Sequence, residues 1–503
     1  MNSSTPHLHY LKIKDLGIDT YRENILFIRA DSHICKSEGF TYLKRVVLQK
    51  NNAKVIATLN VVTSDILKKG EAGLSKEAMK RLGVISGERI IISHLQPVAS
   101  LRHVRAKIYK QTLNEQAILE IIKDIVDGKY SNIEIAAFIS ACAGNNLSVK
   151  EIIGLTKAMV SVGSKIDWKK NMILDKHCVG GLPGNRTTPI VVSIIAAAGL
   201  TIPKTSSRAI TSPAGTADTM ETITKVNLSV KDIKKVIKKE GGCFVWGGAV
   251  KLSPADDILI TIEKALDIDS EGQMVASVLS KKIAAGSTHL VIDIPVGPTA
   301  KVRSNEEALK LQYYFKAVSD VIGIKSKIII TDGTQPVGRG IGPSLEAMDI
   351  LSVLRNEAKA PLDLKERAIS ISAILLKMSG KYPIGSEVAL ATKLLESGDA
   401  YKKFKAICIA QGGFKEPVFA KYKYDVLAKS AGIVKVIDNR KLSRIAKLAG
   451  APQSPSAGIE YHAPIGKKIK KGDLLFSIYS ESNSALEYAK EYLNSLDELI
   501  ILK

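Results

Sequence analysis

Residues 176–188, Lys-His-Cys-Val-Gly-Gly-Leu-Pro-Gly-Asn-Arg-Thr-Thr, constrain the fold of this chain more than any other stretch. They join an extended segment, 172–175, to an apolar run, 190–198, that has the character of a helix. Backbone N–H groups of such a loop, together with the positive end of the helix dipole, form an anion-binding site in many α/β proteins. Pro189 suits a first helical turn, where its missing N–H costs nothing. The loop therefore predicts an α/β lobe with an anion site, although a purely structural Gly-rich loop has a similar pattern.

A second polar loop, 205–218, follows the next apolar segment and is rich in Ser and Thr. Hydroxyl groups beside a cation can hold phosphate and ribose oxygens, but many turns have the same composition. Two further strands, 290–294 and 327–331, each precede a Gly-containing loop. Alternating strands and helices predict a parallel or mixed sheet with its site at the strand ends. Residues 338–342, Gly-Arg-Gly-Ile-Gly, lack the spacing and acidic partner of a dinucleotide motif, so that interpretation is rejected.

The flanking regions differ in their periodicity. Residues 1–95 alternate apolar and polar runs, which predicts a β-rich, barrel-like domain. Residues 96–165 have helical periodicity and two capping-box patterns, and 425–503 return to a hairpin-rich α+β pattern. We thus expect an α/β fold class: a small helical lobe, a mixed α/β-sheet lobe over 166–424, an N-terminal β-rich domain and a C-terminal α+β domain. Within the region 166–424, the residues at about 250–285 are expected to return to the helical lobe.

The composition narrows the possible partners. The net charge of +22 suits either nucleic acid or phosphorylated small molecules, but aromatic residues are only 5% of the chain and stacking platforms are scarce. We therefore expect no nucleic-acid partner. No segment has the roughly 20 apolar residues of a membrane span, and residues 1–14 do not resemble a secretory signal. Five widely spaced cysteines argue against a zinc site or a disulfide framework and favour the cytoplasm.

Four ordered motifs closely resemble those of the thymidine and pyrimidine-nucleoside phosphorylase family. They are Lys176-His177 with the following double glycine, 206–221 with Ser-Ser-Arg and Gly-Thr-x-Asp, 277–282 (Ser-Val-Leu-Ser-Lys-Lys) and 331–336 (Thr-Asp-Gly-Thr-Gln-Pro). Together with the segments between and around them they extend the resemblance over roughly 400 residues. The N-terminal domain and Pro183 resemble the longer branch of the family, which also contains AMP phosphorylases.

The resemblance implies a reaction in which inorganic phosphate attacks the anomeric carbon of a nucleoside and the base leaves. Thymidine is the substrate implied by the family name, and AMP, giving ribose 1,5-bisphosphate, is the alternative. Phosphate is then a co-substrate, and no other cofactor and no metal are expected. A homodimer or higher homo-oligomer is also implied.

Site residues follow from the resemblance position by position. The phosphate ligands match Lys176, Thr188, Ser206 and Thr216, while His177 matches a residue beside the base and sugar. Asp269 falls where the AMP-phosphorylase branch has its proton donor, but it could instead cap a helix. Lys281 matches a lysine that contacts the base in the pyrimidine enzymes. The nucleotide-binding positions of the AMP branch match Gly181, Ser207, Arg208, Ala209, Ile210, Thr211, Ser212, Thr216, Ser277 and Lys301.

Two residues depart from the family pattern. Ile262 occupies the position of the arginine that reads a pyrimidine base, and an aliphatic side chain cannot make that bidentate contact. Cys178 replaces a serine that helps hold phosphate, and a thiol is a weaker donor. These departures affect the identity of the substrate rather than the class of reaction. Two other hypotheses remain: a phosphoribosyltransferase using a pyrophosphorylated sugar with Mg²⁺, and a nucleic-acid-binding protein.

Overall fold

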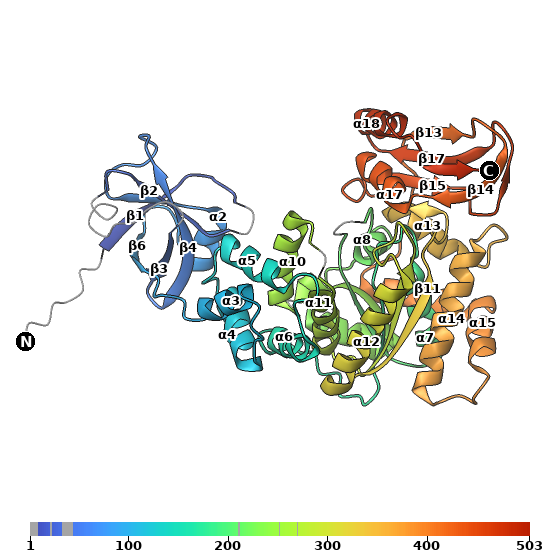
Figure 1. Cartoon of the computed structure of the whole chain (residues 1–503), viewed down its shortest axis with the longest axis horizontal. Coiled ribbons are helices and arrows are strands. Elements are labelled where there is room, and N and C mark those ends of the chain that lie inside the picture. Colours follow the sequence, from blue (N-terminus) through green and yellow to red (C-terminus); the bar gives the residue numbers. More distant parts are fainter. Residues whose placement is uncertain (1–8, 21–22, 33–43, 210–211, 251, 269) are drawn as a thin grey trace, which may run out of the picture. The chain divides into compact units, whose positions relative to one another are not determined.

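The computed structural model of the 503-residue chain describes residues 9–20, 23–32, 44–209, 212–250, 252–268 and 270–503 (Figure 1). The chain forms two compact units, residues 1–141 and 142–503. Within the described ranges, no helix combines the length and apolar character that crossing a bilayer requires.

Six strands of the first unit close into a barrel in the order β1-β5-β2-β4-β3-β6. Their bounds are β1 His9–Asp15, β2 Ile25–Arg29, β3 Arg45–Lys50, β4 Ala53–Val62, β5 Glu71–Leu74 and β6 Arg89–His94. Alternate residues such as Leu26 and Ile28 are fully buried, as expected when successive side chains point to opposite faces. A short helix, α2 (Lys76–Leu82), begins at the N-cap Ser75. The β-rich character expected of the N-terminal region is confirmed.

Helices follow the barrel, as the periodicity predicts. They are α3 (Leu101–Ile108), α4 (Glu115–Val126), α5 (Asn132–Cys142) and α6 (Val149–Ser161). A stripe of four isoleucines on α4 (Ile118, Ile121, Ile122 and Ile125) is buried, and Ser148 with Glu151 forms a complete capping box at the start of α6. Farther along the chain, α10 (Pro254–Leu266) and α11 (Glu271–Ala284) are helical, and α11 packs on α6.

Parallel strands form the centre of the α/β lobe. β7 (Leu174–Cys178), β10 (His289–Val296) and β11 (Lys325–Asp332) make one sheet in the order β11-β10-β7. β8 (Ile202–Ser206) and β9 (Gly242–Trp246) form a second parallel pair. The helices are α7 Thr187–Ala197, α8 Thr216–Glu221, α9 Val230–Glu240, α12 Asn305–Ile322, α13 Pro343–Leu354, α14 Leu362–Ser379, α15 Glu387–Glu396 and α16 Asp399–Gln411, with a 3₁₀ turn, η1, at Gly247–Val250. The parallel or mixed sheet expected from the sequence is therefore parallel.

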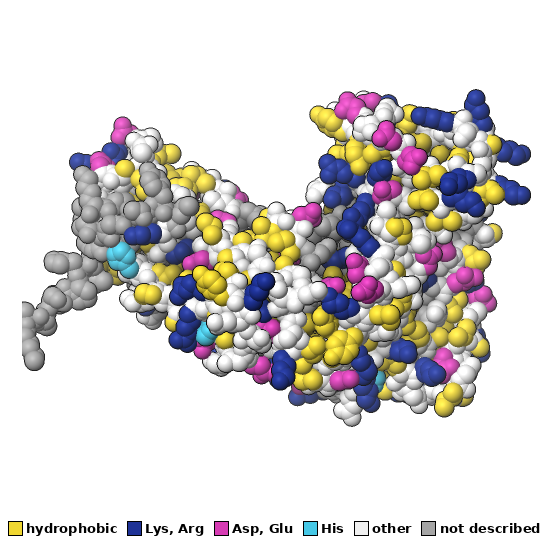
Figure 2. Space-filling view, in the orientation of Figure 1, with side chains coloured by type: hydrophobic (Ala, Val, Ile, Leu, Met, Phe, Trp, Pro, Cys, Tyr) yellow, Lys and Arg dark blue, Asp and Glu magenta, His cyan; other side chains and the backbone are white. Residues whose placement is uncertain are grey.

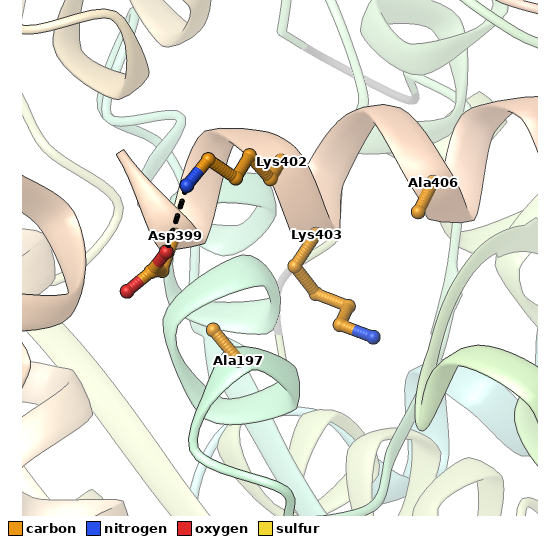
Figure 3. Close-up of a pocket in the computed structure, with 5 residues that line it drawn as sticks. All are labelled: Ala197, Asp399, Lys402, Lys403 and Ala406. Carbon is orange, nitrogen blue, oxygen red and sulfur yellow. Dashed lines mark hydrogen bonds and ion pairs between the residues drawn. The ribbon is translucent and has the colours of Figure 1, made fainter. Parts of the chain in front are cut away.

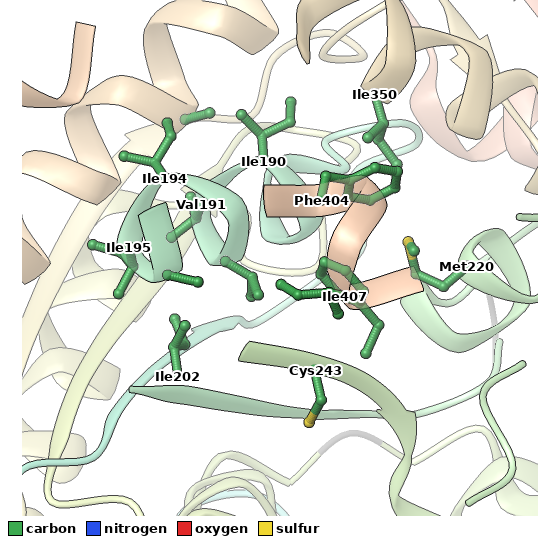
Figure 4. Close-up of a cluster of buried hydrophobic side chains, with 14 of the residues drawn as sticks. Ile190, Val191, Ile194, Ile195, Ile202, Met220, Cys243, Ile350, Phe404 and Ile407 are labelled. Atoms are coloured by element: carbon green, nitrogen blue, oxygen red, sulfur yellow. The ribbon is translucent and has the colours of Figure 1, made fainter. Parts of the chain in front are cut away.

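The largest core surrounds α7, whose Ile190, Val191, Ile194 and Ile195 are fully buried. Figure 4 shows Ile202 of β8 below α7, and Phe404 and Ile407 of α16 to its right. A helix that is apolar on all sides is stable only when it is enclosed by other elements. Enclosure on every side fixes the N-terminus of α7 at the edge of the sheet.

The C-terminal region forms its own layered α+β domain. Its main sheet has the order β12-β15-β17-β13, and a second sheet has the order β16-β14-β18. The bounds are β12 Gly340–Ile341, β13 Tyr422–Leu427, β14 Gly432–Ile437, β15 Gly458–Tyr461, β16 Lys468–Ile469, β17 Leu474–Ser480, β18 Ile500–Leu502, α17 Asn439–Leu448 and α18 Asn483–Asn494. Because β12 comes from residues before α13, this sheet includes a strand from the segment expected to belong to the α/β lobe. The predicted fold class is confirmed.

Candidate active site

Two of the four predicted phosphate ligands lie on parallel strands, and the other two, Thr188 and Thr216, lie in the first turns of α7 and α8. Lys176 lies within β7, and Ser206 is the last residue of β8. In the neighbouring strand β10, Asp293 is aligned with Cys178. Ligands in open α/β sheets bind at the carboxyl ends of the strands, where the loops after the strands meet the N-termini of helices. The architecture therefore positions the two predicted loops to act together.

Lys176 is almost completely enclosed and points to the first turn of α7. Its Nζ donates a 2.8 Å hydrogen bond to Oγ1 of Thr187, and Thr188, the next residue, is also buried. Burial lowers the pKa of Lys176 below its usual value. An ammonium group beside two threonine residues at a helix N-terminus is suited to an oxyanion.

The glycines of the first loop allow close approach of another segment. Gly180 and Gly181 have φ values of +91° and +79°, in the left-handed region that favours glycine. A Cβ added at Gly181 would lie only 2.4 Å from Cβ of Lys301. The structure thus places two predicted nucleotide-binding residues, Gly181 and Lys301, in contact, although 120 positions of sequence separate them.

His177 is partly exposed in a strongly cationic environment. Burial, followed by the charges of Lys282, Lys204, Lys281 and Lys176, holds the pKa of His177 well below its usual value. The imidazole is therefore neutral at pH 7, with one nitrogen as donor and the other as acceptor. A neutral ring can share a hydrogen bond with a base or a sugar.

Ser206 begins the second predicted loop and has a buried Oγ for which the described residues supply no hydrogen-bond partner. Buried hydroxyl groups are usually satisfied, so an unsatisfied one at a strand end is consistent with an external ligand. Ser207 and Ala209 continue the loop, and Ser212 donates from its Oγ to the carbonyl of Ala214. Ile210 and Thr211 lie outside the described residues.

Asp218 of α8 holds this loop in shape. Its Oδ2 accepts hydrogen bonds from the N–H groups of Ala209 at 2.6 Å and Gly215 at 2.9 Å. Arg208 forms ion pairs with Asp218 at 3.1 Å and with Glu221 at 2.6 Å. The guanidinium of Arg208 is thus occupied by loop carboxylates, and its nucleotide contact stays a prediction.

Arg186, which sequence reasoning did not select, connects the two loops. It is the N-cap residue of α7, and its Nη1 donates to Oγ1 of Thr216 at 3.0 Å. Its Nε donates to the buried carboxylate of Glu346 at 2.7 Å, and Nη2 donates to the carbonyl of Ala214. The only sequence signal was an arginine next to two threonines in the glycine loop. Arg186 thus links Thr216 of the second loop to the N-terminus of α7, the helix whose first turn Lys176 contacts.

Two further predicted residues, Ser277 and Lys281, lie on α11. Ser277 is partly exposed, and Nζ of Lys281 forms a 2.8 Å ion pair with Oδ2 of Asp256 on α10. Ile262, also on α10, is partly buried. Asp269 lies outside the described residues, so neither its role as proton donor nor its role as a cap is tested. The described N-cap of α11 is Ser270.

Cys178 is partly exposed and next to His177. Nδ2 of Asn185 approaches its Sγ at 3.4 Å, and burial raises the pKa of the thiol to about 11. A thiol that stays protonated at neutral pH is a poor nucleophile. Cys178 is therefore a weak hydrogen-bond donor within the first loop.

A surface hollow lies at the opposite end of α7 from these loops (Figure 3). Ala197, the last residue of α7, lines it together with Asp399, Lys402, Lys403 and Ala406 of α16. Lys402 pairs with Asp399, and Lys403 pairs with Glu240 of α9. A helix C-terminus repels anions, and both lysines already have carboxylate partners, so this hollow is not suited to phosphate.

Basic side chains lie among acidic and neutral side chains on the one face that Figure 2 shows. Many of the described lysines take part in ion pairs, such as Lys310 with Glu271 and Lys365 with Glu396.

Three family models match the chain in succession. The helical bundle domain of a glycosyl transferase family matches residues 101–163, and the a/b domain of the same family matches 170–401. The C-terminal domain of pyrimidine nucleoside phosphorylases matches 433–497.

Relatives with curated names match nearly the whole chain. A protein of Legionella pneumophila (strain Paris), named "Putative thymidine phosphorylase", is 53% identical, and the match covers 98% of this chain and 96% of that protein. A protein of the same name from Hahella chejuensis is 53% identical over 97% of this chain and 96% of the relative. A third, from Polaromonas sp., is 51% identical over 99% and 98%.

Among solved structures, the anthranilate phosphoribosyltransferase of Thermus thermophilus has a similar fold. It superposes with a TM-score of 0.51 at 19% identity, covering 61% of this chain and 98% of that protein. This likeness concerns the fold alone.

Proposed function

Because this chain belongs to the thymidine and pyrimidine-nucleoside phosphorylase family of pentosyltransferases, we propose that its substrate is thymidine and that inorganic phosphate cleaves it. Phosphate oxygen forms a bond to C1′ of the deoxyribose while the C1′–N bond breaks. The base leaves with the electron pair of that bond and accepts a proton, which gives thymine and deoxyribose 1-phosphate. The names of the near-full-length relatives support thymidine as the substrate.

The observation that carries the proposal is the set of anion-binding groups at the sheet edge. Lys176, Thr188, Ser206 and Thr216 hold phosphate in this mechanism, and Arg186, which is ion-paired with Glu346, positions Thr216 beside them. Positioned cations and N–H groups lower the barrier because they stabilise negative charge where it moves during the reaction. Holding phosphate against the sugar also makes the attack effectively unimolecular.

The leaving base is stabilised from the other side of the sugar. His177 is neutral and can donate a hydrogen bond to a base carbonyl while charge develops there. Asp269 supplies the proton if its carboxyl group is protonated near neutral pH. Ser277 and Lys281 of α11 bind the base in this arrangement.

One observation favours AMP as a second candidate. Lys301 lies against Gly181 in the phosphate loop, and this closeness supports a role for its side chain in binding a 5′-phosphate. In addition, Ile262 stands at the position of the arginine that binds a pyrimidine base in the family. With AMP the products are adenine and ribose 1,5-bisphosphate.

A panel of thymidine, uridine, AMP and CMP separates the two candidates. Each is incubated with phosphate and the released base is quantified, with phosphate-free and chelator-containing reactions as controls. The proposal predicts phosphate-dependent release of thymine that a chelator does not reduce. Cleavage confined to 5′-phosphorylated substrates would eliminate thymidine in favour of AMP, and a requirement for a divalent metal would favour the phosphoribosyltransferase hypothesis.

A further inference from the structure

A buried charge cluster lies directly beneath the loop that carries Lys176 and His177. The carboxylate of Asp175 in β7 has no exposed surface and accepts four hydrogen bonds. Its Oδ2 accepts from Nζ of Lys282 at 2.9 Å and from Oγ of Ser287 at 2.9 Å. Its Oδ1 accepts from Nζ of Lys204 at 3.3 Å and from the backbone N–H of Lys176 at 2.7 Å.

The same cluster holds both peptide groups of Lys176. Its N–H donates to Asp175, and its carbonyl accepts a 2.5 Å hydrogen bond from Nζ of Lys204. Lys204 comes from β8 and Lys282 from α11, so two other elements of the lobe meet at Asp175 of β7. The backbone of Lys176 is thus fixed on both sides.

Strand geometry places Asp175 and His177 on the same face of β7, because side chains two residues apart in a strand point the same way. The lysines bound to Asp175 therefore lie on the side of β7 from which the imidazole projects. We propose that Asp175, Lys204 and Lys282 form a positioning triad that fixes the Lys176–His177 backbone and supplies positive charge beneath His177. This inference rests on the proposed phosphorolysis reaction.

A purely structural role explains the triad poorly. Buried ion pairs contribute little net stability, since desolvation offsets the attraction, and well-packed apolar residues are often as stable. Here two buried lysines share one carboxylate, so the cluster carries an excess positive charge whenever both lysines are protonated. This excess charge has a functional role if it lowers the pKa of the neighbouring His177. Asp175 itself is saturated with donors and fully enclosed, so it cannot serve as a general base.

The charges have the expected effect on neighbouring groups. Burial alone would raise the pKa of Asp175, but Lys204 and Lys282 hold it below its usual value. Burial lowers the pKa of Lys282 to about 7 despite its pairing with Asp175. At His177, burial is the main cause of the low pKa, followed by Lys282 and Lys204, with Lys281 and Lys176 adding smaller contributions.

Two variants test the triad, and each removes the charge of a different lysine. Lys282→Met removes one charge, while Lys204→Gln removes the other but keeps a donor for the Lys176 carbonyl. Both are compared with Lys316→Met, which removes an exposed lysine paired with Asp320 on α12. The pKa of His177 is measured by NMR, with its signal assigned from a His177→Asn variant, together with kcat and the KM for phosphate.

The triad predicts that the pKa of His177 rises by about one unit in both charge variants, which corresponds to about a tenfold change in the protonation equilibrium. We expect kcat to fall about tenfold or more and the phosphate KM to change less, because the phosphate ligands remain. Lys282→Arg, which keeps the charge, should restore the low pKa of His177. Lys316→Met should resemble wild type in all three measurements.

Unchanged pKa and kcat in both charge variants would overturn the proposal. Failure of both variants to fold would assign the triad to folding instead and would also overturn it. If wild type cleaves none of the substrates, the proposed function fails, whereas the NMR titration still tests the charge effect on His177. If wild type is active and both charge variants match it, only the triad is wrong.

Discussion

Cys178 shows how a single side chain can adjust phosphate binding. The thiol lies beside His177, and burial keeps it protonated at neutral pH. Its S–H is a weak donor, whereas the hydroxyl of serine donates and accepts strongly. We expect Cys178→Ser to lower the KM for phosphate severalfold and leave kcat nearly unchanged, as measured by initial rates over a phosphate series.

Cys408→Ser is the matched control, because that thiol is buried in the core around α7 rather than in the loop. The control should leave the phosphate KM at its wild-type value. An unchanged or raised KM in Cys178→Ser would show that Cys178 does not face the phosphate.

Among single residues, those fixed by local motifs could be predicted from the sequence, and those fixed by distant contacts could not. Lys176 and Thr188 were predicted because they surround one glycine loop. Arg186 was missed because its partner Thr216 is 30 positions away and Glu346 is 160 away. The bond from Lys282 to Asp175 spans 107 positions. Such long-range pairs depend on how the strands and helices assemble.

At the scale of elements, the glycine loop between β7 and α7 offers a matched pair of tests. Gly180 and Gly181 both have positive φ values, but a Cβ at Gly180 would meet nothing within 4 Å, whereas one at Gly181 would overlap Lys301. Alanine at either position incurs the left-handed strain of about 1–2 kcal/mol. Only Gly181→Ala also displaces the segment that carries Lys301.

We therefore expect Gly181→Ala to reduce kcat/KM at least about tenfold relative to Gly180→Ala, since even small displacements of binding groups slow a positioned reaction. Steady-state kinetics of the two variants, with thermal unfolding to match their stability, provides the comparison. Equal losses in the two variants would mean that the contact with Lys301 has no part in the reaction.

The elements themselves were mostly predictable. The isoleucine stripe of α4 and the capping box of α6 are local signals, and both helices form as expected. The short strand β12 was not predicted, because a two-residue strand has no periodicity of its own. It forms only because β15, which lies far later in the chain, pairs with it.

At the scale of the whole molecule, we expect the stability of the fold to depend on pH because of Asp349, a residue of α13 that holds the segment leading into β12. Asp349 accepts hydrogen bonds from the N–H groups of Arg339 and Gly340, each at 2.7 Å. Burial, opposed by these bonds and assisted by Asp363, raises the pKa of Asp349 from 3.8 to about 7. Between these values the folded protein binds a proton that the unfolded chain has released, so this carboxyl group makes folding less favourable as pH rises.

Asp349→Asn removes that titration and keeps an oxygen that can accept both hydrogen bonds. The stability of the variant relative to wild type should increase between about pH 4 and pH 7, by at most about 1.4 kcal/mol per pH unit, and level off above that range. Urea unfolding at several pH values measures it. A stability difference that is constant with pH would show that Asp349 does not titrate in this range.

The central claim is that Lys176 holds the phosphate that cleaves a nucleoside. Its most direct test follows deoxyribose 1-phosphate by ³¹P NMR while wild type, Lys176→Ala and the exposed-lysine variant Lys169→Ala act on thymidine over a series of phosphate concentrations. We predict phosphate-dependent product with wild type and Lys169→Ala. For folded Lys176→Ala we predict a much higher phosphate requirement and a loss of about 10²–10³-fold in turnover. Phosphorolysis by Lys176→Ala at the wild-type rate and phosphate KM would contradict the account.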